Sequence, residues 1–365
     1  MKYEFFRKKD IFKCVNDVIN NIGNPPWDYY FLLNLPESEY PKYLKKIFKY
    51  RTGENLNLKH PKTFNEKIQW IKLYGVTPLM RDCTDKVKVR DYVREKIGEE
   101  YLKPVLQIIP NESHETMRCH CEQTNDHLMS ARQSTDICQD TPDCHGTQNV
   151  VVPRNDRTHD NKNNDITTYF DQINFDKLPN SFVMKCSHGC KWQYIIKNKE
   201  EYLKNKRLFD ITRRQITGWL EQEFWVWEGF EMQYKGIEPK ILIEPLMRDE
   251  INIPSQEIQI YFINNLPKLV IKLHNDKQIT LYDENLNCID EKFSEGDQKI
   301  FYKPDDILKQ TIDLSIKLIK NSNFKFVRAD WMIYQNKPYF EELTFTPYSG
   351  FRNINKKIDI NYLVL

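Results

Sequence analysis

Two carboxylates near the C-terminus have a spacing that suits chemistry. They lie in the stretch FVRADWMIYQNKPYFEELTFTP. Its alternation of apolar and polar residues predicts two antiparallel strands joined by a three-residue turn at 335–337. In that register Tyr334 pairs with Pro338, and Asp330 lies opposite Glu342. Like charges directly opposite each other destabilise a sheet, so a bound partner must offset their repulsion.

The same register pairs Arg328 with Thr344 and adds both to the face that carries the carboxylates. A two-residue turn would instead place Glu341 opposite Asp330. That register would mix polar residues into the apolar face, because a slip of one residue turns every side chain over. We therefore expect Glu341 on the apolar side of the hairpin, as a structural or substrate-facing residue.

Two converging carboxylates have three interpretations: an acid/base pair, a site for a hard cation, or a solvated sheet face. Oxygen ligands from one or two carboxylates are what Mg²⁺ prefers, with phosphate and water completing its shell. The nearby Arg328 argues against an acid/base dyad. A cation beside a metal site suits the neutralisation of a transferring phosphoryl group.

Two other segments could bind the rest of a phosphate ligand. Lys185 ends a short predicted strand, 182–184, and precedes a tight turn at 187–191. Such a turn can present backbone N–H groups to an anion, although a surface lysine on an ordinary hairpin is the alternative. In ILIEPLM, Glu244 is a carboxylate in a buried strand and therefore needs a partner. Pro245 lacks an N–H, so backbone groups here are open to a ligand.

The elements that must position these residues alternate between helices and strands, which indicates an α/β or α+β protein. A capping box of Thr63 and Glu66 predicts a helix that Gly75 and Pro78 break. The other expected elements are a helix from about Thr84 to Gly98, a strand at 192–196, a long helix at 199–225, a strand at 239–247, a hairpin at 258–273 and a helix at 306–322.

Residues 111–165 differ in composition from the rest of the chain. They contain no Phe, Trp or Tyr and are rich in polar residues, so we expect a mobile insertion. The segment also contains four cysteines and five histidines: Cys119, Cys121, Cys138, Cys144, His114, His120, His127, His145 and His159. A zinc site is the alternative, but the paired C-x₂-C spacing of closed tetrahedral sites is missing.

The composition limits the partners. The chain has 365 residues and a formal net charge of +2, so bulk charge indicates neither nucleic acid nor an anionic membrane as partner. It has no apolar run of about 18 residues and no hydrophobic signal-peptide core near residue 1, so we expect no transmembrane segment and a cytoplasmic protein. Its nine cysteines form no regular framework and are expected to be mostly reduced.

Five segments together, in this order, carry a family resemblance: KTFNEKIQWIKLYG, TDKVKVRDYVREKIGEEYLKPVL, FDKLPNSFVMKCSHG, EMQYKGIEPKILIEPLM and FVRADWMIYQNKPYFEELTFTP. The chain resembles the ATP-grasp superfamily and, within it, the teichuronopeptide-biosynthesis (TupA-like) family. The resemblance implies an α+β ATP-grasp fold, in which two α+β subdomains clamp ATP, with a helical N-terminal region. The expected domains are a helical region at 1–110, the insertion at 111–165, a lid subdomain with the phosphate loop at 166–245, and a C-terminal subdomain with the metal site at 246–365.

The resemblance also assigns roles to single residues. It implies Mg²⁺ ligands at Asp330, Glu342 and Thr344, the last where many relatives have asparagine, and a catalytic arginine near the γ-phosphate at Arg328. It implies ATP contacts to the phosphates from Lys86 and Lys185 (Lys185 also catalytic), to adenine from the hinge Glu244, Pro245 and Leu246, and to the ribose from Glu257. His188 lies in the phosphate loop and is a candidate contact for the γ-phosphate.

The implied reaction joins a carboxylate to an amine through an acyl phosphate. The expected partners are a small-molecule or saccharide carboxylate and an amine from the assembly of a cell-surface polysaccharide or capsule, and peripheral association with that machinery is allowed. Three departures from the family pattern occur: Glu257-Ile258-Gln259 where relatives tend to have Asp-Tyr-Lys, the glycine-poor loop SHGCKW, and Tyr348-Ser349-Gly350 after TFTP, where Gly-Ser-Gly is expected. The alternatives are a glycosyltransferase, although no convincing D-x-D motif is present, and a nucleotide-binding protein without turnover.

Overall fold

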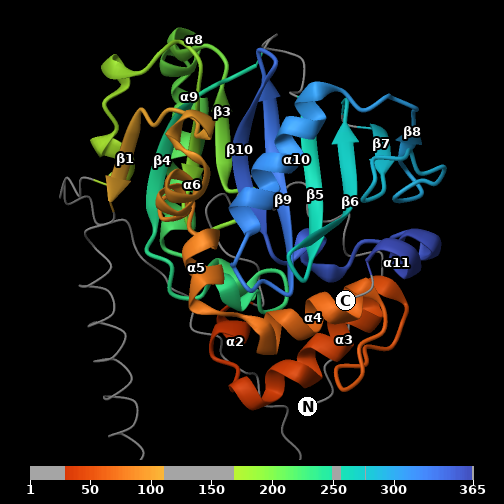
Figure 1. Ribbon diagram of the computed structural model, residues 1–365. Helices are drawn as coiled ribbons and strands as arrows, with labels where there is room; N and C mark the ends of the chain where they lie inside the picture. Colours follow the sequence, from red (N-terminus) through yellow and green to blue (C-terminus); the bar gives the residue numbers. More distant parts are fainter. Residues whose placement is uncertain (1–28, 111–167, 249–255, 276, 364–365) are drawn as a thin grey trace, which may run out of the picture.

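The computed structural model describes residues 29–110, 168–248, 256–275 and 277–363 (Figure 1). The Cys/His-containing segment expected to be a mobile insertion therefore lies outside the described residues.

Two sheets form the centre of the molecule. One has four antiparallel strands in the order β1-β4-β2-β3: β1 (Gln107–Pro110), β4 (Lys240–Pro245), β2 (Phe182–Cys186) and β3 (Gln193–Ile196). The other has six strands in the order β10-β9-β5-β6-β7-β8: β10 (Lys337–Thr344), β9 (Phe326–Tyr334), β5 (Gln256–Ile263), β6 (Leu266–Leu273), β7 (Gln278–Tyr282) and β8 (Gln298–Lys299). Figure 1 shows the hairpin β9–β10 at the edge of the larger sheet nearer the smaller one.

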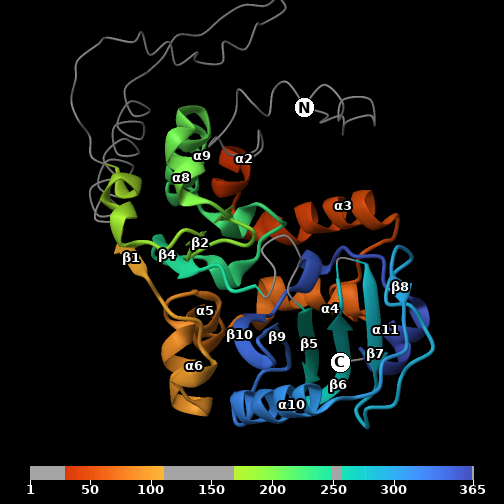
Figure 2. The same ribbon diagram turned by 90° about the horizontal axis from the view of Figure 1, so that it is seen from above.

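Helices cover both faces of the six-stranded sheet (Figure 2). α10 (Asp306–Ile319) packs on β5 and β10, and Trp331 donates its indole N–H to Ser315 Oγ at 2.7 Å. On the opposite face, Phe64 of α4 (Phe64–Trp70) meets Phe326 edge-on, with ring centroids 5.0 Å apart. Side chains alternate along β9, so the face under α4 is also the face of Arg328 and Asp330.

The N-terminal region is helical, as expected. Its α-helices are α2 (Tyr29–Leu33), α3 (Tyr40–Thr52), α4, α5 (Pro78–Thr84) and α6 (Val89–Ile97). The capping box of Thr63 and Glu66 is confirmed. The second helix was expected from Thr84 and instead begins at Val89. Pro78 opens α5, because proline suits the first turn of a helix, where its missing N–H leaves no bond unmade.

The long helix expected at 199–225 is two helices, α8 (Lys199–Lys204) and α9 (Lys206–Leu220). Asn205 separates them because its side chain accepts a hydrogen bond from Leu208 N at 3.0 Å and so caps α9. α11 (Lys356–Tyr362) is the last described helix. η3 (Ile71–Gly75) is a short π-helix. The short 3₁₀-helices are η2 (Glu37–Glu39), η4 (Glu99–Tyr101), η5 (Tyr169–Gln172), η6 (Phe175–Lys177), η7 (Phe224–Val226), η8 (Met232–Tyr234) and η9 (Pro347–Gly350).

The strands β2, β3 and β4, the hairpin β5–β6 and the amphipathic helix α10 confirm the sequence predictions. The strands β1, β7 and β8 were missed: all three are short, and the partner of β1, β4, is more than 100 residues away in sequence. Among the described residues, no helix is both long and apolar enough to span a membrane.

Candidate active site

The turn of the hairpin β9–β10 differs from the prediction, although the predicted pairs Asp330–Glu342 and Arg328–Thr344 are confirmed. Tyr334 pairs with Lys337, not with Pro338, so the turn has two residues. Gln335 and Asn336 have φ values of 48° and 59°, as a type I′ turn requires. A β-bulge between Phe340 and Glu342 then shifts the register by one residue. The bulge therefore brings Glu342 opposite Asp330 despite the tighter turn, and Glu341 is the extra residue.

The face of the hairpin that was expected to be polar brings four predicted residues together. Arg328 donates to both oxygens of Asp330, from Nε to Oδ1 and from Nη2 to Oδ2, each at 2.6 Å. The Thr344 hydroxyl lies 2.9 Å from Asp330 Oδ2 and 2.9 Å from Glu342 Oε1. A hydroxyl has one proton to donate, so it satisfies only one of these two carboxylates.

Burial governs the charges of this group. Burial raises the pKa of Asp330 to about 6, against the opposing effect of Arg328, and the nearby Glu342 adds to the rise. For Arg328, burial disfavours the charged form, but the Asp330 carboxylate outweighs it and raises the pKa well above its usual value. Among the described residues, Arg328 Nη1 is a buried donor with no hydrogen-bond partner.

The donor set of this face fits a hard cation. No group of three or more His, Cys, Asp and Glu residues that could hold a metal ion occurs in the described part of the chain. The face instead supplies two carboxylates and one hydroxyl, and the single proton of Thr344 cannot satisfy both carboxylates, so carboxylate lone pairs remain for a cation. Magnesium sites of this kind take their remaining ligands from phosphate and water.

Glu257, the expected ribose contact, lies at the start of β5, opposite Met332 of β9. The residue is exposed on the surface of the strand. Desolvation by the protein atoms around its carboxyl group, together with repulsion by Glu341 and Asp330, raises its pKa to about 7. Gln259, where the resemblance implied a lysine, is the cross-strand neighbour of Asp330.

The phosphate-loop segment is a tight turn between β2 and β3, and it is closed by the bond from Cys186 N to Trp192 O at 2.9 Å. Gly189 cannot carry a side chain here, because a Cβ would lie 2.3 Å from the Trp192 ring. Lys86 contacts this loop, with its Nζ 2.6 Å from Gly189 O. The His188 ring packs edge-on against Trp192 and lies 3.0 Å from Trp219 O, so the structure places it in the core behind the loop and not beside the hairpin.

The hinge segment lies at the end of β4, beside Lys185. Glu244 Oε2 is 2.9 Å from Lys185 Nζ, which gives this carboxylate the partner that its burial requires. Burial would raise the pKa of Glu244, but Lys103 and Lys185 lower it below its usual value. Pro245 is the last residue of the strand, and Leu246 N donates to Ser181 O at 3.3 Å. The adenine-binding role of the hinge stays a prediction.

Sequence reasoning missed the partners of Glu341. This side chain reaches the smaller sheet, where its Oε2 lies 2.5 Å from Lys103 Nζ and 3.5 Å from Lys185 Nζ. Against the effect of burial, Lys103 and Lys185 lower the pKa of Glu341 to about 2. The one available signal was Lys103 itself, a lone lysine in the otherwise apolar run YLKPVL.

The PYSG turn, η9, begins at Pro347, with two residues between it and the end of β10. Tyr348, Ser349 and Gly350 have φ values of 53°, 53° and 66°, so three successive residues are left-handed. Buried side chains bind the turn: Gln69 Nε2 donates to the carbonyls of Ser349 and Gly350, each at 2.9 Å, and Lys72 Nζ donates to Ser349 O at 2.7 Å. Tyr348 lies beside the hairpin, with its ring 5.5 Å from the Arg328 guanidinium carbon.

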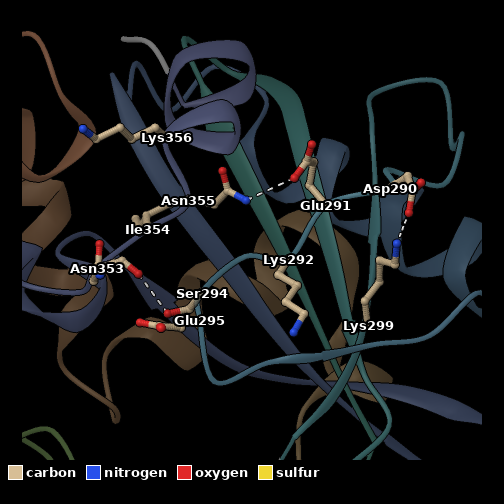
Figure 3. Close-up of a pocket in the computed structure, with 10 residues that line it drawn as sticks. All are labelled: Asp290, Glu291, Lys292, Ser294, Glu295, Lys299, Asn353, Ile354, Asn355 and Lys356. Carbon is tan, nitrogen blue, oxygen red and sulfur yellow. Dashed lines mark hydrogen bonds and ion pairs between the residues drawn. The ribbon is translucent and has the colours of Figure 1, made fainter.

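A depression of about 500 Å³ lies elsewhere, between the loop after β7 and the segment before α11 (Figure 3). None of the predicted site residues lines it. Figure 3 shows that several of its polar groups pair with one another, such as Asp290 with Lys299 and Asn355 with Glu291.

Several solved structures are remotely similar to the chain. For D-alanine–D-alanine ligase from Bacillus anthracis with ATP, the identity is 12% and the TM-score 0.32, over 72% of this chain and 54% of that one. The same ligase in another crystal structure gives 13% and 0.36, over 76% and 63%. The ATP-grasp ligase PsnB with its minimal precursor, Mg and ADP gives 10% and 0.30, over 76% and 56%. The chain therefore spans less than two thirds of the length of each of these ligases.

No curated protein matches the chain. A family model does match, under the description TupA-like ATPgrasp, over residues 162–362. The match includes the phosphate loop, the hinge and the whole hairpin, but not Lys86 or the other N-terminal segments of the resemblance. Because it covers more than half of the 365 residues, it establishes the family. The chain belongs to the TupA-like ATP-grasp family.

Proposed function

We propose that this protein is an ATP- and Mg²⁺-dependent ligase that joins a carboxylate to an amine through an acyl phosphate. The observation that carries the proposal is the polar face of the hairpin. There Arg328, Asp330, Glu342 and Thr344 meet, and the adjacent Glu341 reaches Lys185 on the smaller sheet. The face thus offers oxygen ligands for a cation beside two positive charges suited to phosphates.

The proposed roles follow from this arrangement. Asp330, Glu342 and Thr344 would hold Mg²⁺, which neutralises phosphate charge when bound. Lys185 and Lys86 bind the phosphates from the loop side. Arg328 lies on the metal-binding face, with its unpartnered Nη1 available to an anionic oxygen. No side-chain nucleophile is needed, because such catalysis rests on positioning and electrostatic stabilisation.

The proposed reaction has two transfers. The carboxylate oxygen of the acid attacks the γ-phosphorus of ATP, the bond from that phosphorus to ADP breaks, and an acyl phosphate forms. The amine nitrogen then attacks the acyl carbon, the carbon–oxygen bond to phosphate breaks, and the nitrogen releases a proton. The products are an amide, ADP and inorganic phosphate. We propose an acid and an amine from the assembly of a cell-surface polysaccharide, on the basis of family membership.

A nucleotide-binding protein without turnover is the second candidate. Gln259, in place of the lysine of relatives, lies directly beside Asp330 and removes a positive charge from the site.

One assay separates the candidates. The full chain is incubated with ATP, Mg²⁺ and pools of uronic acids, amino acids and amines, and the release of ADP and phosphate is followed. ADP release that depends on the carboxylate supports the ligase. Nucleotide binding without release supports the second candidate. Release of UDP from a UDP-sugar, with ATP inert, would establish a glycosyltransferase and refute the ligase.

A further inference from the structure

Five charged side chains, some buried and some half-buried, form a cluster between the two sheets. We call this set, Arg90, Lys103, Lys185, Glu244 and Glu341, the charge cluster. Lys185 and Glu244 come from β2 and β4 of the smaller sheet, and Glu341 comes from the bulge in β10 of the larger one. Lys103 lies just before β1 and is only 6% exposed. Lys185, the lysine proposed to bind phosphate, therefore lies close to a second lysine and two carboxylates.

The distances give each lysine its own carboxylate. Lys103 Nζ is 2.5 Å from Glu341 and 3.6 Å from Glu244. Lys185 Nζ shows the reverse preference, at 2.9 Å from Glu244 and 3.5 Å from Glu341. Arg90 adds a contact to the other oxygen of Glu244, at 3.5 Å, and binds the Lys103 carbonyl at 2.7 Å. Lys103 thus belongs first to Glu341, and Lys185 to Glu244.

The bulge explains why Glu341 needs such a partner. Bulges re-aim side chains and are frequent next to active sites. Here Glu341 is the extra residue of the bulge, and its carboxylate reaches Lys103 beside the smaller sheet. A carboxylate placed there without its own cation would be drawn to Lys185, because a partly buried charge gains strongly from pairing. Lys185 would then be neutralised by two carboxylates and would have less attraction left for phosphate.

We propose that Lys103 is a positioning residue that pairs with Glu341 and thereby leaves Lys185 available to the nucleotide phosphates. Lys103 does not itself contact the nucleotide in this proposal, which rests on the proposed function in that Lys185 is taken to bind phosphate. The role differs from a merely structural one, because it predicts that removing both charges is less harmful to nucleotide binding than removing Lys103 alone.

The test measures the dissociation constant of the non-hydrolysable ATP analogue AMPPNP with Mg²⁺ by calorimetry, on the full chain. In Lys103→Met, Glu341 competes for Lys185, and we expect the dissociation constant to rise about tenfold or more. In the double variant Lys103→Met/Glu341→Gln, the competing carboxylate is gone, and affinity should return to within about threefold of the wild type. Glu341→Gln alone should bind no more weakly than the wild type.

A matched control is Lys272→Met. Lys272 is a buried lysine that is also 2.5 Å from its carboxylate, Asp305, but it pairs with α10 on the opposite face of the larger sheet. The Lys272→Met variant should have a lower free energy of unfolding and an unchanged dissociation constant for AMPPNP. If Lys103→Met does not fold, Lys103→Gln, which keeps a hydrogen-bond donor without the charge, takes its place in the same comparison.

The proposal is overturned if the Lys103 variant binds as tightly as the wild type. It is equally overturned if the double variant binds as weakly as the single one, because Lys103 would then act on the nucleotide directly. Failure of the wild type to bind AMPPNP would instead refute the proposed function. In that case urea unfolding of the same four proteins still decides whether Lys103 and Glu341 are paired: non-additive effects support the pairing, and additive effects refute it.

Discussion

At the scale of single residues, two adjacent glutamates have different surroundings. Glu342 shares the Thr344 hydroxyl with Asp330, whereas Glu341 pairs with Lys103 across the gap between the sheets. Glu341 is the extra residue of the bulge, so it has no cross-strand partner in β9, and its side chain is re-aimed out of the regular alternation. The two carboxylates are therefore expected to affect activity in different ways.

Glu342→Gln should abolish turnover, because the amide keeps the size of the side chain but loses the charge that a magnesium ion needs. We expect kcat for carboxylate-dependent ADP release to fall at least about 100-fold. Glu341→Gln is the matched neighbour and should keep much of the turnover. If Glu341 proves to be the essential glutamate, the assignment of Glu342 as the metal ligand is wrong.

At the scale of elements, Asp305 holds the start of α10 in two ways. Its Oδ1 accepts the Leu308 amide at 2.7 Å, and its Oδ2 lies 2.5 Å from the buried Lys272 of β6. Burial would raise the pKa of Asp305, but the bonds from Lys272 and Leu308 lower it below the usual 3.8. A lowered pKa means that the folded state favours the ionised form.

Asp305→Asn should therefore keep the cap and lose the ion pair, with a fall of about 1–3 kcal/mol in the free energy of unfolding. A depressed carboxylate pKa stabilises the fold above the usual pKa, and that contribution is lost as the pH falls below it. The difference between wild type and variant in urea unfolding should accordingly be full at pH 7 and shrink below pH 3.8. Asp306→Asn, at a fully exposed neighbour, should change little. A difference that stays constant with pH would contradict the ion pair.

The left-handed turn after β10 is the second element with a sharp requirement. At Gly350 φ is +66°, and a Cβ would lie 2.5 Å from Gln69 Nε2 and 2.8 Å from Ile68 Cγ2. Both the backbone conformation and the space around it exclude a side chain.

Gly350→Ala should lower the free energy of unfolding by about 1–3 kcal/mol, measured in urea. Gly296→Ala is the control, because a Cβ there meets nothing within 4 Å. Equal stabilities for the two variants would show that the turn relaxes without cost. If the turn helps to form the acceptor site, Gly350→Ala should also raise KM for the amine more than KM for ATP.

At the scale of the whole molecule, buried polar contacts join segments far apart in sequence. Lys72, in η3, donates to Glu228 O and Ser349 O, each at 2.7 Å, and its ammonium lies 4.6 Å from the centre of the Phe351 ring. Burial lowers its pKa to about 7, against the opposing charge of Glu231. Lys72 therefore joins the helical region, the segment before β4 and the turn after β10.

Lys72→Met should leave two buried carbonyls without this donor and lower the free energy of unfolding by about 2–4 kcal/mol. Hydrogen exchange should become faster in both α4 and η9, although they are far apart in sequence. Lys46→Met, at an exposed position on α3, should change neither quantity. Faster exchange confined to α4 would contradict the proposed coupling.

The sequence by itself determined much of this protein. Local patterns predicted the capping box at Thr63, the strands β2 and β4, the hairpin β5–β6 and helix α10, because each depends on residues close together in the chain. The alternation of buried and polar residues also predicted that Asp330 faces Glu342, and the order of the motifs predicted the family.

Only the tertiary structure decided how that pairing is reached and what surrounds it. The sequence suggested a three-residue turn, whereas the chain makes a two-residue turn and restores the register with a bulge at Glu341. A bulge is stabilised by contacts across space, here with Lys103, which is more than 200 residues away in the chain. Short-range patterns carry no information on such contacts, because two distant charges meet only when both sheets have formed.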